Sequence, residues 1–217
     1  YCEAARQPVA TTCLDTTGRG NGGHAKHRTR RAGTYVGRAW LHERQGGTWS
    51  EIAEFDPVGE RPGDGTGEVL AMRGDVVALG AGRHDLGDPA QLANAGVVFV
   101  FEETGGAWAQ TATLALPGPR AQDRFGASVV LGDDVLLVGA PGRDLGAEDA
   151  GAVYRFRRTP TGWQPAGAPL TSATPGPDVG FGVALALGAL HAHAGHGFEG
   201  SGEEGREALD VGGSRPG

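Results

Sequence analysis

Pairs of glycines recur along this chain at one constant spacing. Thirteen positions separate the two members of each pair, which are Gly67 and Gly80, Gly126 and Gly139, and Gly182 and Gly195. In the first two pairs, short apolar runs lie on either side of a Gly-Asp dipeptide. This dipeptide is typical of a hairpin turn, because both residues tolerate a positive φ. The spacing therefore predicts a β-hairpin that is repeated with a fixed internal length.

A second hairpin accompanies the first. Twelve positions separate a glycine from a tryptophan in three places, which are Gly37 and Trp49, Gly96 and Trp108, and Gly151 and Trp163. Aromatic residues alternate in the run between them, as at Phe99 and Phe101, so both rings share one face of a strand. A polar turn ends the run, and the tryptophan opens another strand. Each repeat thus predicts four short strands.

The composition excludes a helical bundle. The 217 residues include 40 glycines and 13 prolines, and in a helix interior each glycine costs about 1 kcal/mol and each proline about 3 kcal/mol. Four antiparallel strands per repeat predict an all-β fold of β-propeller blades, with about three blade units in an incomplete propeller. A sandwich built from duplicated hairpins is the alternative.

The central copy resembles the FG-GAP repeat, the blade unit of integrin-α-like β-propellers, and most closely its bacterial variant with a short Gly-Asp turn. Phe125-Gly126 and Gly139-Ala140-Pro141 carry the likeness, followed by Tyr154 and Trp163. The resemblance implies blades over residues 33–197, with two complete blades at about 66–117 and 125–171 and a half-blade on each side. Such propellers commonly close with about seven blades. We therefore expect a longer parent chain, association with further copies, or a remnant.

The two ends of the chain lack the blade pattern. Residues 1–32 carry six basic side chains against Glu3 and Asp15, and residues 198–217 are rich in Gly and Glu. We predict disorder at both ends, since neither has the apolar residues that would offset the entropy of ordering. The basic run is a solvated tail or a polyanion-binding arm. Cys2 and Cys13 form a disulfide or stay as two free thiols.

The charge argues against a nucleic-acid partner, and the hydropathy argues against a membrane-spanning segment. The formal net charge is −7, whereas a general nucleic-acid binder needs clustered Lys and Arg to neutralise phosphates. No run reaches the about 18 apolar residues of a membrane span. We expect neither a nucleic-acid partner nor a membrane span. No signal peptide is visible, but the resemblance implies an extracellular or cell-envelope location.

Two loops contain residues that ligate metals in other proteins. Oxygen ligands for calcium gather at Asp144, Glu148 and Asp149, with solvated turns as the alternative. An H-x-H-x-x-H cluster at His191, His193 and His196 has the donors of a zinc site, with sequence drift in a terminal half-blade as the alternative. We expect no other cofactor.

No motif for nucleophilic or phosphate-loop chemistry occurs, so we expect a protein that is not an enzyme. The resemblance implies recognition or adhesion, with a protein or glycan ligand at the blade loops that follow Gly80 and Gly139. The three repeat tryptophans either form inter-blade core or stack on sugars. The alternatives are an accessory propeller of a larger secreted or surface enzyme, and a structural fragment that closes through oligomerisation or a longer chain.

Overall fold

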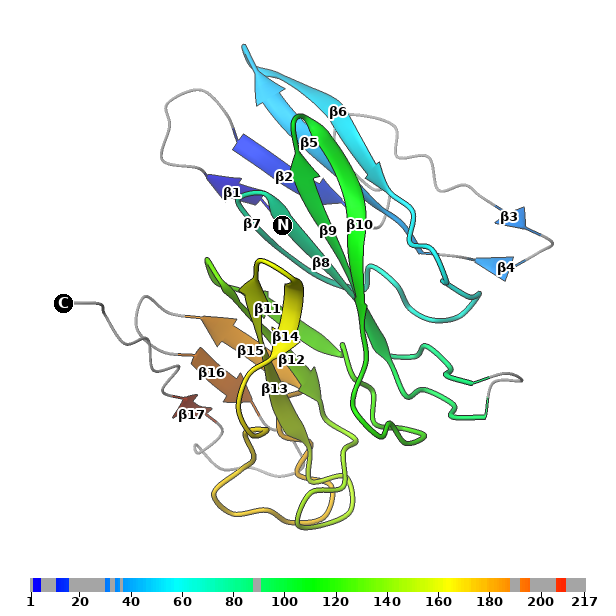
Figure 1. Cartoon of the computed structure of the whole chain (residues 1–217), viewed down its shortest axis with the longest axis vertical. Coiled ribbons are helices and arrows are strands. Elements are labelled where there is room, and N and C mark those ends of the chain that lie inside the picture. The colour runs from blue at the N-terminus through cyan, green and yellow to red at the C-terminus, as the bar shows by residue number, and fades with distance from the viewer. Residues whose placement is uncertain are drawn as a thin grey trace.

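The computed structural model describes residues 2–4, 11–15, 30–31, 34–35, 37–87, 91–187, 192–195 and 206–209, with side chains at 37–87 and 91–187. Every regular element of secondary structure within these ranges is a β-strand (Figure 1). In chain order they are β1 (Cys2–Ala4), β2 (Thr11–Asp15), β3 (Arg30–Arg31), β4 (Thr34–Tyr35), β5 (Ala39–Gln45), β6 (Thr48–Phe55), β7 (Val69–Arg73), β8 (Val76–Ala81), β9 (Val97–Thr104), β10 (Ala107–Leu114), β11 (Ser128–Leu131), β12 (Val135–Ala140), β13 (Ala152–Thr159), β14 (Gly162–Pro165), β15 (Ala184–Leu187), β16 (Ala192–Gly195) and β17 (Arg206–Leu209).

The strands form four antiparallel blades. Blade 1 has the order β1-β2-β5-β6, blade 2 is β7-β8-β9-β10, blade 3 is β11-β12-β13-β14, and blade 4 is β15-β16-β17. Strands β3 and β4 form a separate two-stranded sheet. The sheets do not close into a ring over the residues described. The prediction of an all-β fold with four-stranded antiparallel blades in an incomplete propeller is confirmed, and blades 2 and 3 are the two blades predicted to be complete. Blade 1, predicted as a half-blade, also has four strands, because β1 and β2 pair with β5 and β6.

Consecutive blades pack through their first strands. Strand β7 lies beside β11, and β11 lies beside β15, so the blades diverge from a shared inner edge (Figure 1). Strands β1, β2, β3 and β17 lie outside the range 33–197. Most of residues 1–32 and 198–217 lie outside the part that the structure describes, so the disorder predicted for both ends stays a prediction. Strand β1 pairs with β2 so that Cys2 is opposite Cys13, a register compatible with the predicted disulfide.

The core consists of apolar layers between neighbouring blades. One layer joins blade 2, through residues such as Val98 and Leu114, to blade 3, where Leu136 and Phe156 face it. A second layer joins blades 1 and 2 around Phe55, with Leu41 from blade 1 and Phe99 from blade 2. Burial of these aliphatic and aromatic side chains supplies about 25 cal/mol for each Å² removed from water. The blades therefore stabilise one another.

Two of the three repeat tryptophans lie in these layers. Trp163 is buried between blades 2 and 3 and donates its Nε1–H to Glu102 Oε1 at 2.9 Å. Trp108 is half-buried and meets the ring of Phe55 edge-on, with 5.3 Å between centroids. Trp49 is 43 % exposed. Trp163 and Trp108 each contact the blade before their own, and no blade before blade 1 is among the described residues. The inter-blade interpretation fits Trp108 and Trp163.

Glycines make the closest contacts between blades. A Cβ on Gly80 would collide with the carbonyl oxygen of Gly126, and a Cβ on Gly139 would collide with that of Gly182. The second glycine of each spaced pair therefore meets the first glycine of the next pair. Ser128 stabilises the same contact between blades 3 and 4, because its buried hydroxyl donates a hydrogen bond to Gly182 O at 2.6 Å. The constant spacing in the sequence thus follows from backbone contact between blades.

Replacing Gly139 with alanine should destabilise the protein by about 3 kcal/mol, because the added methyl group must push the backbone of Gly182 away from β12. Urea unfolding followed by tryptophan fluorescence measures the change. Gly176→Ala is the matched control, since its Cβ would make only an ordinary contact with Val179. Equal stabilities for the two variants would contradict the glycine contact.

Candidate functional site

The segment that leads into each blade has an alternating backbone conformation. Three residues with positive φ, separated by one residue each, precede the first strand of blades 2, 3 and 4. They are Gly63, Gly65 and Gly67 before blade 2, Gln122, Arg124 and Gly126 before blade 3, and Asp178, Gly180 and Gly182 before blade 4. Glycine adopts this conformation without penalty, whereas Gln122 and Arg124 do so at an energetic cost. We call these segments the entry turns.

The entry turns of blades 3 and 4 are hydrogen-bonded to the loop between the second and third strands of the blade before them. In the entry turn of blade 3, Gln122 N–H donates to Ala93 O at 2.8 Å and Arg124 N–H donates to Asn94 O at 3.0 Å. The entry turn of blade 4 repeats this pattern with Asp178 and Gly180, which donate to Glu148 O and Asp149 O. The alternating conformation directs these N–H groups toward the preceding blade, so the loops of one blade are positioned by the next.

In two of the entry turns, a buried aspartate carboxylate accepts hydrogen bonds that stabilise the turn. Asp64 Oδ2 lies 2.6 Å from His84 Nδ1, with 3 % and 7 % of the two residues exposed. The same positions in blade 3 hold Asp123 and Arg143, whose Oδ2 and Nη1 lie 2.9 Å apart. In both cases the carboxylate also accepts a backbone N–H three residues earlier. The repeated geometry identifies the Asp64–His84 pair as a structural brace in which histidine replaces arginine.

Because arginine fills this position in blade 3, His84→Arg should leave the free energy of unfolding within about 1 kcal/mol of its original value. His84→Ala should cost about 3 kcal/mol, since it leaves a buried carboxylate without its side-chain partner. Chemical denaturation of both variants measures the difference. The brace would be refuted if arginine destabilised the protein as much as alanine.

Glu60 lies at the junction of blades 1 and 2. Its Oε1 accepts the backbone N–H of Gly37 at 2.6 Å. Burial of the carboxyl group raises the pKa of Glu60 to about 7, and the nearby charges of Asp56 and Asp64 act in the same direction. The Gly37 hydrogen bond opposes this shift. Glu60 therefore changes charge near neutral pH in the folded protein.

The folded state binds a proton at Glu60 more tightly than the unfolded chain does, in which the pKa of the carboxyl group is 4.5. The contribution of Glu60 to stability should be fully present below this value and should be lost as pH rises through about 7. Glu60→Gln keeps the acceptor for Gly37 but cannot ionise, so it should raise the melting temperature at about pH 8 and leave it unchanged at about pH 4. Thermal unfolding across this range tests the expectation, with the exposed Glu51→Gln as control. A pH-independent effect of Glu60→Gln would contradict it.

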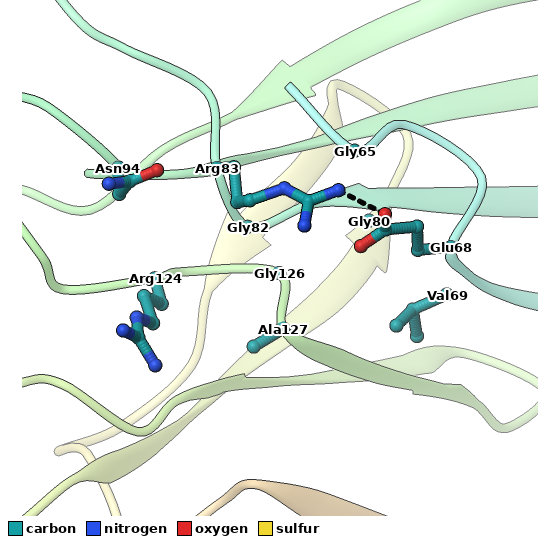
Figure 2. Close-up of a pocket in the computed structure, with 10 residues that line it drawn as sticks. All are labelled: Gly65, Glu68, Val69, Gly80, Gly82, Arg83, Asn94, Arg124, Gly126 and Ala127. Carbon is teal, nitrogen blue, oxygen red and sulfur yellow. Dashed lines mark hydrogen bonds and ion pairs between the residues drawn. The ribbon is translucent and has the colours of Figure 1, made fainter. Parts of the chain in front are cut away.

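A pocket of about 360 Å³ opens between blades 2 and 3, beside the entry turn of blade 3 (Figure 2). Its lining is mostly backbone and small side chains. Ten residues form it, and they are Gly65, Glu68, Val69, Gly80, Gly82, Arg83, Asn94, Arg124, Gly126 and Ala127. The glycines of the inter-blade contact leave this space open, because side chains at those positions would fill it.

The charged residues of the pocket come from both blades. Arg83 forms an ion pair with Glu68, and the pair lies directly over Gly65, where a Cβ would touch both side chains. Figure 2 shows Arg83 reaching across to Glu68, whereas the side chain of Arg124 lies apart from this pair. Arg124 is exposed. The pocket thus presents one paired and one unpaired guanidinium group.

The loop after Gly80, where the sequence predicts a partner, lines the pocket through Gly82, Arg83 and Asn94. Ligand binding by this loop stays a prediction. The loop after Gly139 does not contribute to the pocket. No sequence signal identified Glu68 or Arg124, because their role depends on the contact between two blades. The Asp64–His84 brace was also missed, and the pairing of Asp123 with Arg143 one repeat later is the signal that could have revealed it.

The predicted calcium ligands lie in the loop between β12 and β13. Asp144 Oδ1 accepts the backbone N–H of Asp149 at 2.9 Å, and its Oδ2 lies 3.5 Å from Arg120 Nη1. Among the side chains that the structure describes, no three His, Cys, Asp or Glu residues come together as a metal site. Asp144, Glu148 and Asp149 are therefore not gathered around one point. Calcium binding by this loop stays a prediction from the sequence.

The predicted zinc ligands lie outside the described side chains. His191 and His196 are not among the described residues, and of His193 only the backbone is described, on β16 opposite Ala186. By this register His193 occupies the strand position that Leu137 holds in blade 3, opposite Val130. Zinc binding at these three residues stays a prediction.

Comparison with known proteins bears on the repeat itself. The FG-GAP repeat family matches residues 108–156. This chain carries an FG-GAP repeat. No curated protein matches the chain.

The matched FG-GAP repeat does not coincide with one blade. It begins at Trp108 on β10 of blade 2 and ends at Phe156 on β13 of blade 3. It therefore includes the entry turn of blade 3 and the blade 3 side of the pocket. In the described part of the chain, no helix is long and apolar enough to cross a membrane.

Proposed function

We propose that this chain is a recognition module without catalytic activity, which binds a partner at the pocket between blades 2 and 3. The observation that carries this proposal is the pocket itself, because it combines an open, glycine-lined floor with charged groups at its edge. A pocket of this size is within the range of about 300–1,000 Å³ that is typical of ligand sites.

The architecture supports binding rather than catalysis. The loop from Gly82 to Asn94 is held by hydrogen bonds to the entry turn of blade 3, so its shape is set before a partner arrives. Preorganised loops bind with a smaller entropy loss than mobile ones. Loops that a rigid β-scaffold positions in this way are common recognition surfaces.

The polar groups that resemble catalytic ones are used in the fold. The position of the Asp64–His84 pair is filled in blade 3 by the Asp123–Arg143 ion pair, which has no histidine to act as an acid or base. The hydroxyl of Ser128 donates to a backbone carbonyl in the next blade. The FG-GAP repeat also favours binding, since domains with this repeat often bind other molecules. We place the chain outside the cytoplasm, in recognition or adhesion, because FG-GAP repeats are typical of extracellular proteins.

The proposal predicts that filling the pocket abolishes binding. Peptides selected against the immobilised chain from a displayed random library should bind Ala127→Trp at least about tenfold more weakly, a loss of about 1.4 kcal/mol. The control is Ala107→Trp, which adds the same side chain at the exposed tip of the β9–β10 hairpin. Biolayer interferometry measures both affinities.

Two results would contradict the proposal. Selected peptides might lose no affinity on Ala127→Trp, or they might lose the same affinity on both variants. Circular dichroism of each variant confirms that the blades remain folded, so that a loss of binding reports on the pocket.

A further inference from the structure

We propose that the pocket between blades 2 and 3 accepts a carboxylate, carried on an acidic side chain of a protein partner and bound by Arg124. This inference rests on the proposed function and names the chemistry of the group that enters the site. Three observations support it: the guanidinium group of Arg124 has no described partner, its backbone has a positive φ, and the pocket has a particular set of lining residues.

Arg124 is the arginine near the pocket for which no side-chain partner is described; among the other described residues, the exposed Arg44 on blade 1 also has none. Within residues 58–87 and 91–187, every other arginine has a carboxylate or a backbone carbonyl as a partner; these are Arg61, Arg73, Arg83, Arg120, Arg143, Arg155, Arg157 and Arg158. No partner is described for the guanidinium of Arg124, which is exposed at the edge of the pocket. In a chain with net charge −7, an unneutralised arginine beside a pocket is a specific attraction for an anion.

The backbone gives no reason for an arginine at this position. Arg124 has φ of 54°, and the same position of the entry turn is occupied by Gly65 before blade 2 and by Gly180 before blade 4. Glycine adopts positive φ freely, whereas an arginine there is strained. Strained residues that a fold retains are concentrated at binding sites. The side chain of Arg124 is therefore present for a contact that the isolated chain does not make.

The other pocket residues favour a carboxylate over larger anions. Arg83 forms an ion pair with the carboxylate of Glu68 at the same pocket, so its charge is already neutralised. The charge of Glu68 opposes a doubly charged phosphate more strongly than a single carboxylate. A planar guanidinium group binds a carboxylate through two parallel hydrogen bonds. Arg124 lines the same pocket but lies apart from the Arg83–Glu68 pair (Figure 2), so it can make this contact without breaking that pair.

A protein partner fits the site better than an acidic glycan. None of the ten residues that line the pocket is aromatic, so a sugar ring would find no stacking surface. A polyanionic chain would also meet the net negative charge of the protein beyond the pocket. The glycine floor instead admits one side chain from a partner loop, whose backbone remains outside.

The test is an NMR titration of the ¹⁵N-labelled chain at constant ionic strength, with sodium acetate as the probe of a carboxylate. Acetate should produce saturable shifts at the Nε–H of Arg124 and at the amide of Ala127. Arg124→Gly and Arg124→Gln should weaken this binding at least tenfold. Arg44→Gln, which removes an exposed charge from blade 1, should leave it unchanged.

Arg124→Gly also separates binding from folding. Since glycine is the residue found in the other entry turns, this variant should melt at the same temperature or higher while it loses acetate. Parallel titrations with inorganic phosphate and with glucuronic acid test the other anions. Acetate shifts that are linear, or equal in Arg124→Gly, would overturn the proposal, and so would saturable binding of phosphate or glucuronic acid alone.

The failure of this inference is distinguishable from that of the proposed function. If selected peptides bind in a way that depends on Ala127 but is indifferent to Arg124→Gly, the pocket is a binding site and the carboxylate proposal is wrong. If they are indifferent to Ala127→Trp as well, the proposed function fails too.

Discussion

Backbone contact between glycines of neighbouring blades is the constraint on which the rest of this structure depends. Gly80 meets Gly126, and Gly139 meets Gly182, at distances that leave no room for a Cβ atom. This close approach lets the strands β7, β11 and β15 lie side by side. The apolar layers between the blades then form from the side chains farther along each strand. A larger residue at any of these glycines would separate the inner edges of two blades.

The pocket is a direct consequence of the same contact. Its floor consists of glycines that the packing requires, and its edge consists of residues of the entry turn and of the loop that the entry turn holds. The carboxylates of Asp64 and Asp123 brace these turns from within, with a histidine in one blade and an arginine in the next. The matched FG-GAP repeat includes this junction, since it spans parts of two blades rather than a single blade.

The sequence predicted the strands and the blades because both depend on local periodicity. Glycine spacing, alternating aromatics and Gly-Asp turns identify four strands per repeat, and blades 2 and 3 form as expected. The site was less predictable. The ion pair of Arg83 with Glu68 crosses an entry turn, and the strain of Arg124 appears only when its φ is compared with those of Gly65 and Gly180. Such features arise from contacts between segments distant in the chain, which no local pattern records.

Native-state hydrogen exchange of the entry turn of blade 3 tests the central claim most directly, because the amides of Gln122, Arg124 and Phe125 donate to carbonyls of blade 2 rather than to their own blade. If the blades are locked together at their inner edges, these three amides should be protected about as strongly as those of strand β12. Exchange as fast as that of the exposed hairpin tip at Gly105 would show that the blades separate freely, and it would contradict the account.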